Sequence, residues 1–269
     1  MKAKPATSWR ELLTDPGEDG HIVQLYQDEV FYGEAISHFA AEGIRRGESV
    51  ILVPTKAHWE NISRRLNGKG FNTGELFRRG QLTLLDADDT LPKFMVGNEP
   101  DGRIFKPLAR RTIAKARAGG AYPRVRWWGE MVNVLYVNGN FRGSNRLEEF
   151  FDEVANEESI AIFCSFLMDK FDPKIYEEAF GNVCRTHRHV IPADDYVRHR
   201  RIVDRAIAEV IGEIRGVMLH SLVSWGGAPS IMPSSHALLL WVREKMPEQF
   251  EPVLARARQL EMAVGGRQL

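Results

Sequence analysis

The segment HIVQLYQDEVFYGEAI, residues 21–36, decides how the rest of the chain is interpreted. Its first six residues predict a buried strand, and a helical pattern begins after a short turn. In many α/β proteins a turn of this kind holds a phosphate at the start of the helix. Here the turn has no Gly-rich loop and no Lys-Ser/Thr pair, and it carries the acids Asp28 and Glu29. Their charge would repel an incoming phosphate, so we expect a different use for this edge of the fold.

Apolar runs alternate with amphipathic segments through the first two thirds of the chain. Strands are predicted at residues 21–26, 49–54, 82–86, 124–129 and 160–166. Helices are predicted between them, at residues 30–46, 56–67, 103–118 and 144–157. The runs VILV and AIFC are apolar throughout, which is typical of parallel strands that are covered on both faces. This alternation predicts a three-layer α/β domain with a mainly parallel sheet.

The pattern becomes helical after about residue 171. Residues 172–190 predict a polar helix, 196–222 one long helix, and the segments around 234–246 and 248–263 two more. We therefore divide the chain into an N-terminal lead-in (1–20), an α/β domain (21–192) and an all-helical region (193–269). The helical region is expected to cover the sheet domain, to dimerise or to dock on a partner protein.

Composition limits the classes of function. The formal net charge is zero, so general attraction to nucleic acid or acidic membranes is not expected. The two cysteines, Cys164 and Cys184, are too few for a disulfide framework and fit a reducing compartment. The N-terminus lacks the apolar run of a signal peptide, and no stretch is apolar for the roughly 18 residues of a membrane span. These features predict a cytoplasmic protein.

Ligands of open α/β sheets bind beyond the carboxyl ends of the strands. In the predicted sheet that edge collects Tyr26, Asp28, Thr55, Lys56, Asp86, Asp88, Glu130, Met131, Ser165 and Phe166. Neither GxxxxGK[ST] nor GxGxxG occurs in the chain, which disfavours the usual apparatus of nucleotide hydrolysis. No GxSxG elbow occurs either, so hydrolase chemistry has no support.

Several carboxylates at this edge have two interpretations each. Asp28 is either a helix N-cap or a ligand group. Glu130 is a general base, a metal ligand or an anchor for a cation, or it forms a structural ion pair with Arg126. Asp86 and the two acids that follow it either cap the next helix or bind Mg²⁺. Met95 is expected to line a pocket for an uncharged ligand.

The remaining polar motifs do not predict a catalytic or metal centre. Cys184, His187 and His189 form C-x₂-H-x-H, which is not a standard zinc signature and has no visible second group of ligands. Cys164 lies in an apolar strand and is interpreted as a small core residue. His199 is followed by Arg rather than by the acid usual after a phospho-accepting histidine, and the arginines around it predict an exposed helix face. No metal and no cofactor are predicted.

Seven segments together resemble the MEDS family, the sensory domain of methanogens and methylotrophs. They are HIVQLY with its acidic turn, AAEGIRRGESVILV, GQLTLLDADDTLPKFM, RVRWWGEMVNVL, NRLEEFFDEVA, SIAIFCSF and VCRTHRHVIP. The resemblance covers residues 20–192. It implies a fold similar to RecA-like circadian-clock ATPases without their phosphate-binding loop. It also implies that the chain senses small organic compounds, often hydrocarbon derivatives, and passes the signal to an output module.

The resemblance implies a ligand pocket at the matching motif positions. These are His21, Tyr26, Asp28, Asp86, Met95, Arg126, Glu130 and Met131. No helix-turn-helix is expected before residue 20 and the C-terminal helices lack kinase motifs, so neither direct DNA repression nor autophosphorylation is expected. The prediction is a non-catalytic sensor in signal transduction, with a small organic ligand and with a downstream protein or a second copy of the chain as partner.

Three other functions stay open at this point. The first is a divergent nucleotide enzyme in which Lys56, Asp86 and Glu130 replace the usual phosphate and metal contacts. The second is an interaction scaffold that uses residues 194–269. The third is nucleic-acid binding through the arginines near His199, which would show a strong salt dependence.

Overall fold

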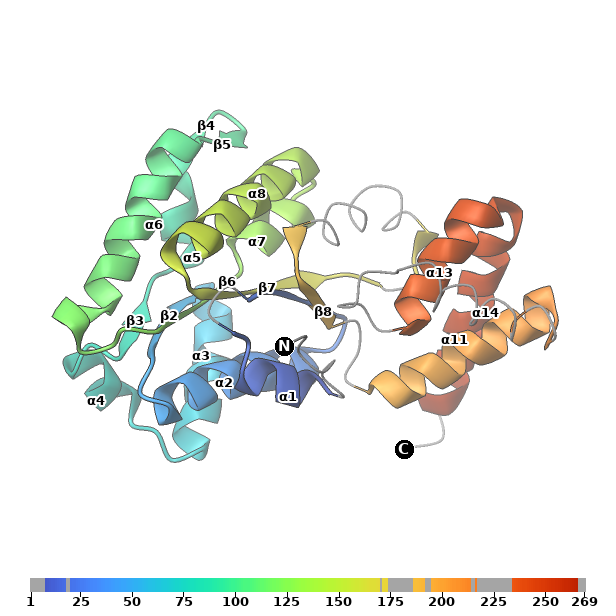
Figure 1. Ribbon diagram of the computed structural model, residues 1–269, viewed down its shortest axis with the longest axis horizontal. Helices are drawn as coiled ribbons and strands as arrows, with labels where there is room; N and C mark the ends of the chain where they lie inside the picture. The colour runs from blue at the N-terminus through green and yellow to red at the C-terminus, as the bar shows by residue number, and fades with distance from the viewer. Residues whose placement is uncertain are drawn as a thin grey trace.

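A six-stranded parallel sheet forms the centre of the protein (Figure 1). The computed structural model describes residues 8–17, 20–169, 171–173, 186–191, 195–213, 216 and 234–265. The strand order is β3-β2-β6-β7-β1-β8, and every pair of neighbours is parallel. The strands are β1 (His21–Tyr26), β2 (Ser49–Val53), β3 (Leu82–Leu84), β6 (Val125–Gly129), β7 (Ala161–Leu167) and β8 (His189–Ile191). The predicted α/β domain with a mainly parallel sheet is confirmed.

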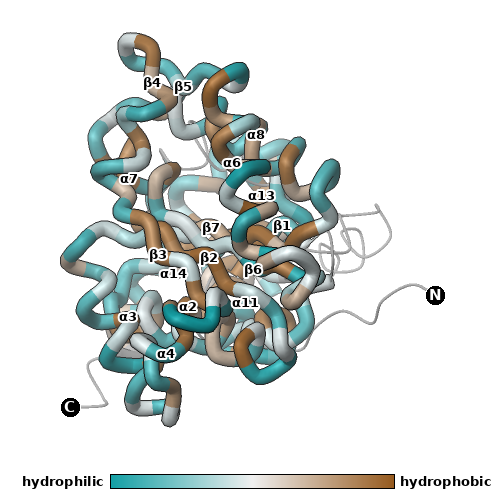
Figure 2. Tube along the Cα trace, turned by 90° about the vertical axis from the view of Figure 1, so that its left-hand side faces the viewer, coloured by the Kyte–Doolittle hydropathy of each residue, from teal (hydrophilic) through white to brown (hydrophobic). Residues whose placement is uncertain are grey.

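Helices cover both faces of this sheet. One face carries α1 (Trp9–Thr14), α2 (Glu29–Arg45), α3 (Lys56–Gly68) and α4 (Thr73–Arg78). The other carries α5 (Ala87–Thr90), α6 (Gly102–Ala116), α7 (Met131–Val137) and α8 (Phe141–Glu158). Alternate residues of β2 enter the two cores, because successive side chains of a strand point to opposite faces. Figure 2 shows the strands as hydrophobic segments at the centre of the helical layers.

Shorter elements connect these layers. They are the 3₁₀ helices η1 (Leu91–Phe94) and η2 (Ala118–Gly120) and the two-stranded hairpin of β4 (Met95–Val96) and β5 (Glu99–Pro100). The lead-in is helical where it is described: Ser8 accepts a hydrogen bond from the Glu11 N–H to cap α1, and Trp9 and Leu13 are buried against α2. Part of the segment predicted as a turn-rich lead-in therefore belongs to the core.

The C-terminal region contributes three described helices, α11 (Tyr196–Ile211), α13 (Ser234–Lys245) and α14 (Pro247–Gly265). They contact one another beside the β8 edge of the sheet (Figure 1). The helix predicted over 196–222 ends at Gly212, whose φ of 103° breaks the helical conformation. Beyond residue 213 only residue 216 of that prediction is described. The polar helix predicted over 172–190 mostly lies outside the described residues, and residues 189–191 form a strand instead.

Two contacts join the helical region to the end of β7. The ring of Phe171 stacks on His199 of α11, with ring centroids 5.6 Å apart, and Arg258 of α14 forms an ion pair with Asp169. His199 is buried and bonds the Ser235 hydroxyl of α13 at 2.9 Å, so it is a packing residue of the helical region. Arg200 and Arg205 lie on the exposed face, as predicted. None of the described helices is long and apolar enough to cross a membrane.

Candidate functional site

The turn after β1 has its own carboxylate at the start of α2. Asp28 accepts hydrogen bonds from the Val30 N–H at 2.8 Å and from the Phe31 N–H at 3.3 Å. These are two of the N–H groups that an anion would use at a helix N-terminus. The N-cap interpretation of Asp28 is therefore confirmed, and a phosphate bound here would have to displace this carboxylate.

Glu130 is the most heavily bonded side chain at the carboxyl edge of the sheet. Its carboxylate is 2% exposed and accepts from the Thr55 N–H at 2.8 Å, the Thr55 hydroxyl at 3.3 Å and the Tyr32 hydroxyl at 3.2 Å. His58 Nδ1 lies 2.9 Å from the same carboxylate. The pairing of Val53 with Gly129 sets this geometry, because it places the residues after β2 beside the residue after β6. We call Tyr26, Tyr32, Thr55, His58 and Glu130 the Glu130 cluster.

The charges within the cluster support an ion pair. The hydrogen bond to Glu130 raises the pKa of His58, and the charge of Glu29 adds to this effect. Burial raises the pKa of the Tyr32 phenol, and the negative charge of Glu130 raises it further. His58 is thereby favoured as an imidazolium beside Glu130, with Tyr32 neutral and able to donate.

Two buried tyrosine rings lie next to these polar groups. The rings of Tyr26 and Tyr32 stack with centroids 4.2 Å apart. The Asn133 amide donates to the Tyr26 hydroxyl at 3.3 Å and accepts from the Leu167 N–H, at the end of β7, at 2.9 Å. His58 forms the solvent side of the cluster, with a quarter of its side chain exposed. Hydrogen-bonding groups and a buried aromatic pair therefore meet at the edge where ligands of parallel sheets bind.

The other predicted residues of this edge have structural partners. Asp86 caps α5 by accepting from the Asp89 N–H at 3.0 Å, so the capping interpretation is confirmed. Met131 begins α7 and is buried in the core. Met95, in the β4–β5 hairpin, is half-buried against the same core. Tyr26 and Asp28 lie at the carboxyl end of β1 and Glu130 at that of β6, with β7 between the two strands, so the structure brings these three predicted residues to the same edge of the sheet.

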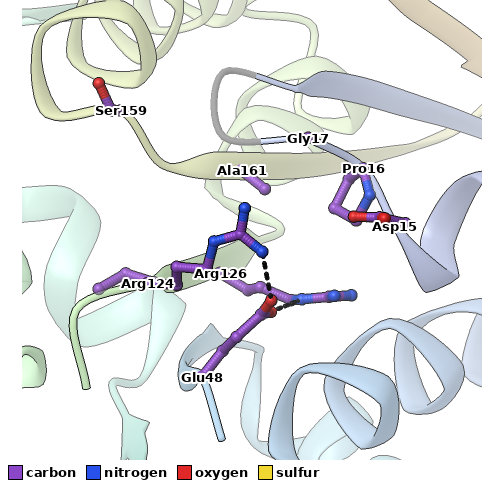
Figure 3. Close-up of a pocket in the computed structure, with 9 residues that line it drawn as sticks. Asp15, Pro16, Gly17, Glu48, Arg124, Arg126, Ser159 and Ala161 are labelled. Atoms are coloured by element: carbon purple, nitrogen blue, oxygen red, sulfur yellow. Dashed lines mark hydrogen bonds and ion pairs between the residues drawn. The ribbon is translucent and has the colours of Figure 1, made fainter. Parts of the chain in front are cut away.

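Arg126 lies at the opposite edge of the sheet, and the predicted ion pair between Arg126 and Glu130 is wrong. Arg126 forms a buried ion pair with Glu48 (Figure 3). It also donates to the carbonyls of Leu13 at 2.8 Å, Thr14 at 3.0 Å and Phe39 at 3.2 Å. Glu130 is four positions further along the chain, which corresponds to roughly 13 Å along a strand. The cavity beside it measures about 20 Å³, which is room for about one water molecule.

His21 also lies away from the Glu130 cluster, at the amino end of β1. It is fully buried among Glu148, Cys164 and His187 and has Asp152 as a further neighbour. Burial alone would lower the pKa of His21, but hydrogen bonds to Asp152 and Glu148 raise it to about 9. For the Glu148 carboxyl, burial alone would raise the pKa. The charge of His187 and hydrogen bonds from both histidines outweigh burial and lower this pKa to about 2.

Sequence reasoning missed Tyr32 and His58. Both lie in the first turn of a helix that follows a strand, and such turns point toward the carboxyl edge of the sheet. A search of those first turns for side chains that can bond a strand-end carboxylate would have found them. Thr55, directly before α3, was placed at this edge by spacing alone.

Comparison with known proteins identifies one family for the α/β domain. A family model for the methanogen/methylotroph DcmR sensory domain matches residues 20–188, well over half of the chain. A search of curated proteins finds no match to the chain. The matched segment begins just before β1 and ends just before β8, so it contains both the Glu130 cluster and the residues around His21. The chain therefore belongs to the MEDS family of sensory domains.

Proposed function

We propose that the protein is a non-catalytic sensor that binds a small organic ligand at the Glu130 cluster. The observation that carries the proposal is the contrast between two neighbouring features of one sheet edge. Asp28 already occupies the helix N-terminus where a nucleotide phosphate would bind, while Glu130 gathers hydroxyl, amide and imidazole groups beside an aromatic pair. The family is sensory, which supports a binding function for this edge.

The chemistry of the cluster favours a small ligand with an apolar part and one hydrogen-bonding or polarised atom. The rings of Tyr26 and Tyr32 are buried and stack on each other, and a ligand that enters beside them would place an alkyl or halogenated carbon against these rings. His58 or Tyr32 can exchange its bond to Glu130 for a bond to the ligand. The family resemblance implies a ligand derived from a hydrocarbon. Dichloromethane and simple alcohols are therefore the first compounds to test.

A chain of direct contacts supports a relay to the C-terminal helices. The Tyr26 hydroxyl bonds Asn133, and Asn133 bonds the Leu167 N–H at the end of β7. Shortly beyond, Asp169 and Phe171 contact α14 and α11. A ligand that shifts Tyr26 would therefore alter the segment on which both helices rest. The output is a change in how α11 and α14 meet a second copy or a downstream protein.

Thermal unfolding of the full chain tests the binding proposal. The chain is heated alone, with ATP–Mg²⁺, with dichloromethane and with methanol. A ligand present at a hundred times its Kd stabilises the fold by about 2.7 kcal/mol. We expect stabilisation by an organic compound and none by ATP–Mg²⁺. Stabilisation by ATP–Mg²⁺ would favour the nucleotide enzyme, and no response to any compound would favour the interaction scaffold.

Paired histidine variants locate the bound ligand. His58→Asn removes the imidazole at the rim of the Glu130 cluster, and His38→Asn removes a histidine that contacts α1 far from it. The ligand-induced shift should be lost in the first variant and kept in the second. An equal shift in both would place the ligand elsewhere.

A further inference from the structure

Four side chains that commonly bind metals meet inside the α/β domain. His21 comes from β1, Cys164 from the adjacent β7, Glu148 from α8 and His187 from the segment just before β8. All four residues are buried, and one donor atom from each lies within 4.8 Å of the other three. We call these four residues the His21 cluster. Strand register brings them together, since Val23 pairs with Cys164 and Ile22 with His189.

Four of the six separations between donor atoms match those of a tetrahedral metal ion, and the other two are no longer than 4.8 Å. Glu148 Oε2 lies 3.3 Å from His21 Nε2 and 3.2 Å from His187 Nε2. Cys164 Sγ lies 3.7 Å from His21 Nε2 and 3.6 Å from Glu148 Oε2. A tetrahedral Zn²⁺ with bonds of about 2.0–2.3 Å holds its ligand atoms roughly 3.3–3.7 Å apart. A salt bridge between His21 and Glu148 alone would not account for the position of the sulfur.

Both imidazoles are oriented as metal-bound histidines are. Each directs Nε2 into the cluster and has an oxygen near Nδ1: Asp152 Oδ1 lies 3.5 Å from His21 Nδ1, and the Thr186 hydroxyl lies 3.1 Å from His187 Nδ1. Such outer oxygens fix the tautomer and direction of ligating histidines. Asp152 follows Glu148 by one helical turn, so α8 supplies both a ligand and its supporting carboxylate.

The charges of these groups are compatible with a divalent cation at this position. A carboxylate and a thiolate with two neutral imidazoles would neutralise an ion of charge two, which is important where all four residues are buried. Glu148 Oε1 has no hydrogen-bond partner among the described residues although it is buried. A mixed nitrogen, sulfur and oxygen set in this geometry suits zinc better than magnesium or calcium, which prefer oxygen.

We propose that His21, Glu148, Cys164 and His187 bind one Zn²⁺ ion. With four protein ligands the site is closed, which is the arrangement of structural zinc rather than of catalytic zinc. The ion would connect the segment before the short edge strand β8, through His187, to α8 and to strands β1 and β7. Because α11 begins shortly after β8, the site would also fix the point where the helical region leaves the sensor domain. Sequence spacing predicted no metal, since these ligands are brought together only by the fold.

Metal analysis of the purified full chain is the direct test. The protein is prepared without chelators, and its zinc content is measured by plasma mass spectrometry. After metal removal, Co²⁺ is added and the near-ultraviolet charge-transfer band of a cobalt–thiolate bond is recorded. We expect one zinc per chain and a clear cobalt–thiolate band. Because the spectrum is taken on the unaltered protein, it does not depend on whether a variant folds.

Four variants then assign the ligands. Cys164→Ser should abolish the cobalt–thiolate band. Glu148→Gln should lower the affinity for zinc by at least as large a factor as Asp152→Asn, the variant that alters the outer carboxylate. Asp152→Asn, which alters only the outer carboxylate, should weaken affinity by about ten- to a hundredfold. Glu130→Gln changes another buried carboxylate, outside the His21 cluster, and should keep one zinc. Absence of stoichiometric metal and of the cobalt band would overturn the proposal. So would full zinc retention in both Cys164→Ser and Glu148→Gln.

Discussion

Replacement of Arg126 by Met is expected to destabilise the protein without altering ligand response. Arg126 is 1% exposed and Glu48 is 6% exposed, so water cannot replace the hydrogen bonds of either side chain when the other is removed. Burial lowers the pKa of Arg126, and the contact with Glu48 opposes this effect. Met fills a similar volume but provides no donor. The variant therefore leaves the buried Glu48 carboxylate with only the half-exposed Arg124, 3.8 Å away, and three carbonyls without their guanidinium bond.

Loss of one partner from a buried ion pair costs about 3–5 kcal/mol. For chains of roughly this size each kcal/mol lowers Tm by about 2–4 °C, so Arg126→Met should lower Tm by roughly 6–20 °C. The double variant Glu48→Leu with Arg126→Met also removes the buried carboxylate that has lost Arg126. Apolar replacement of a whole buried pair is often neutral, so the double variant should recover about 2 kcal/mol or more.

Urea unfolding followed by circular dichroism measures both free energies. A loss below about 1 kcal/mol for Arg126→Met would refute the reasoning, since that is the range of an exposed pair. So would a double variant less stable than the single one. The ligand-induced shift in Tm supplies the functional control. If Arg126→Met removed that shift while the fold remained, Arg126 would be a ligand residue and not a structural one.

Three further outcomes are expected. Asp28→Ala should lower the free energy of unfolding by about 0.5–2 kcal/mol by removing the cap of α2, and urea unfolding would detect it. Gly43→Ala would place its Cβ 2.7 Å from the held Arg126 side chain and should cost about 1–3 kcal/mol; an unchanged Tm would contradict this. The pKa of His58 is raised in the folded state. Its stabilising effect should be complete below pH 6.5, its ordinary value, and be lost as pH rises through the raised value, so Glu130→Gln should flatten that part of the stability–pH curve.

Much of the fold was predictable because the sheet is buried on both faces. All five predicted strands occur, since runs such as residues 49–53 are apolar on both faces and cannot be confused with an amphipathic helix. The missed elements are short or at an edge. Strand β8 has three residues and helix α7 has seven, and segments of this length show too few periods to give a clear pattern.

The candidate sites were less predictable, because side-chain partners depend on register. Placement by strand ends correctly put Tyr26, Asp28 and Glu130 at one edge. The family motifs do not distinguish the two ends of a strand, so His21 and Arg126 were assigned to the same pocket although they lie at the amino edge. Ion-pair partners raise the same difficulty: Glu48 precedes β2 and is distant from Arg126 in sequence, yet the β2–β6 register places them side by side.

The pair β1–β7 links the two clusters, and in the proposed relay it would determine where a signal travels. Six residue pairs hold these strands in register, with His21 at one end of β1 and Tyr26 at the other. Near the middle, Cys164 contacts His21 and Glu148, which anchors that part of β7 to α8. A change at Tyr26 reaches β7 through Asn133 at Leu167, where pairing ends. The anchored half resists motion, so we expect the displacement to pass onward to Asp169 and Phe171, and hence to the C-terminal helices.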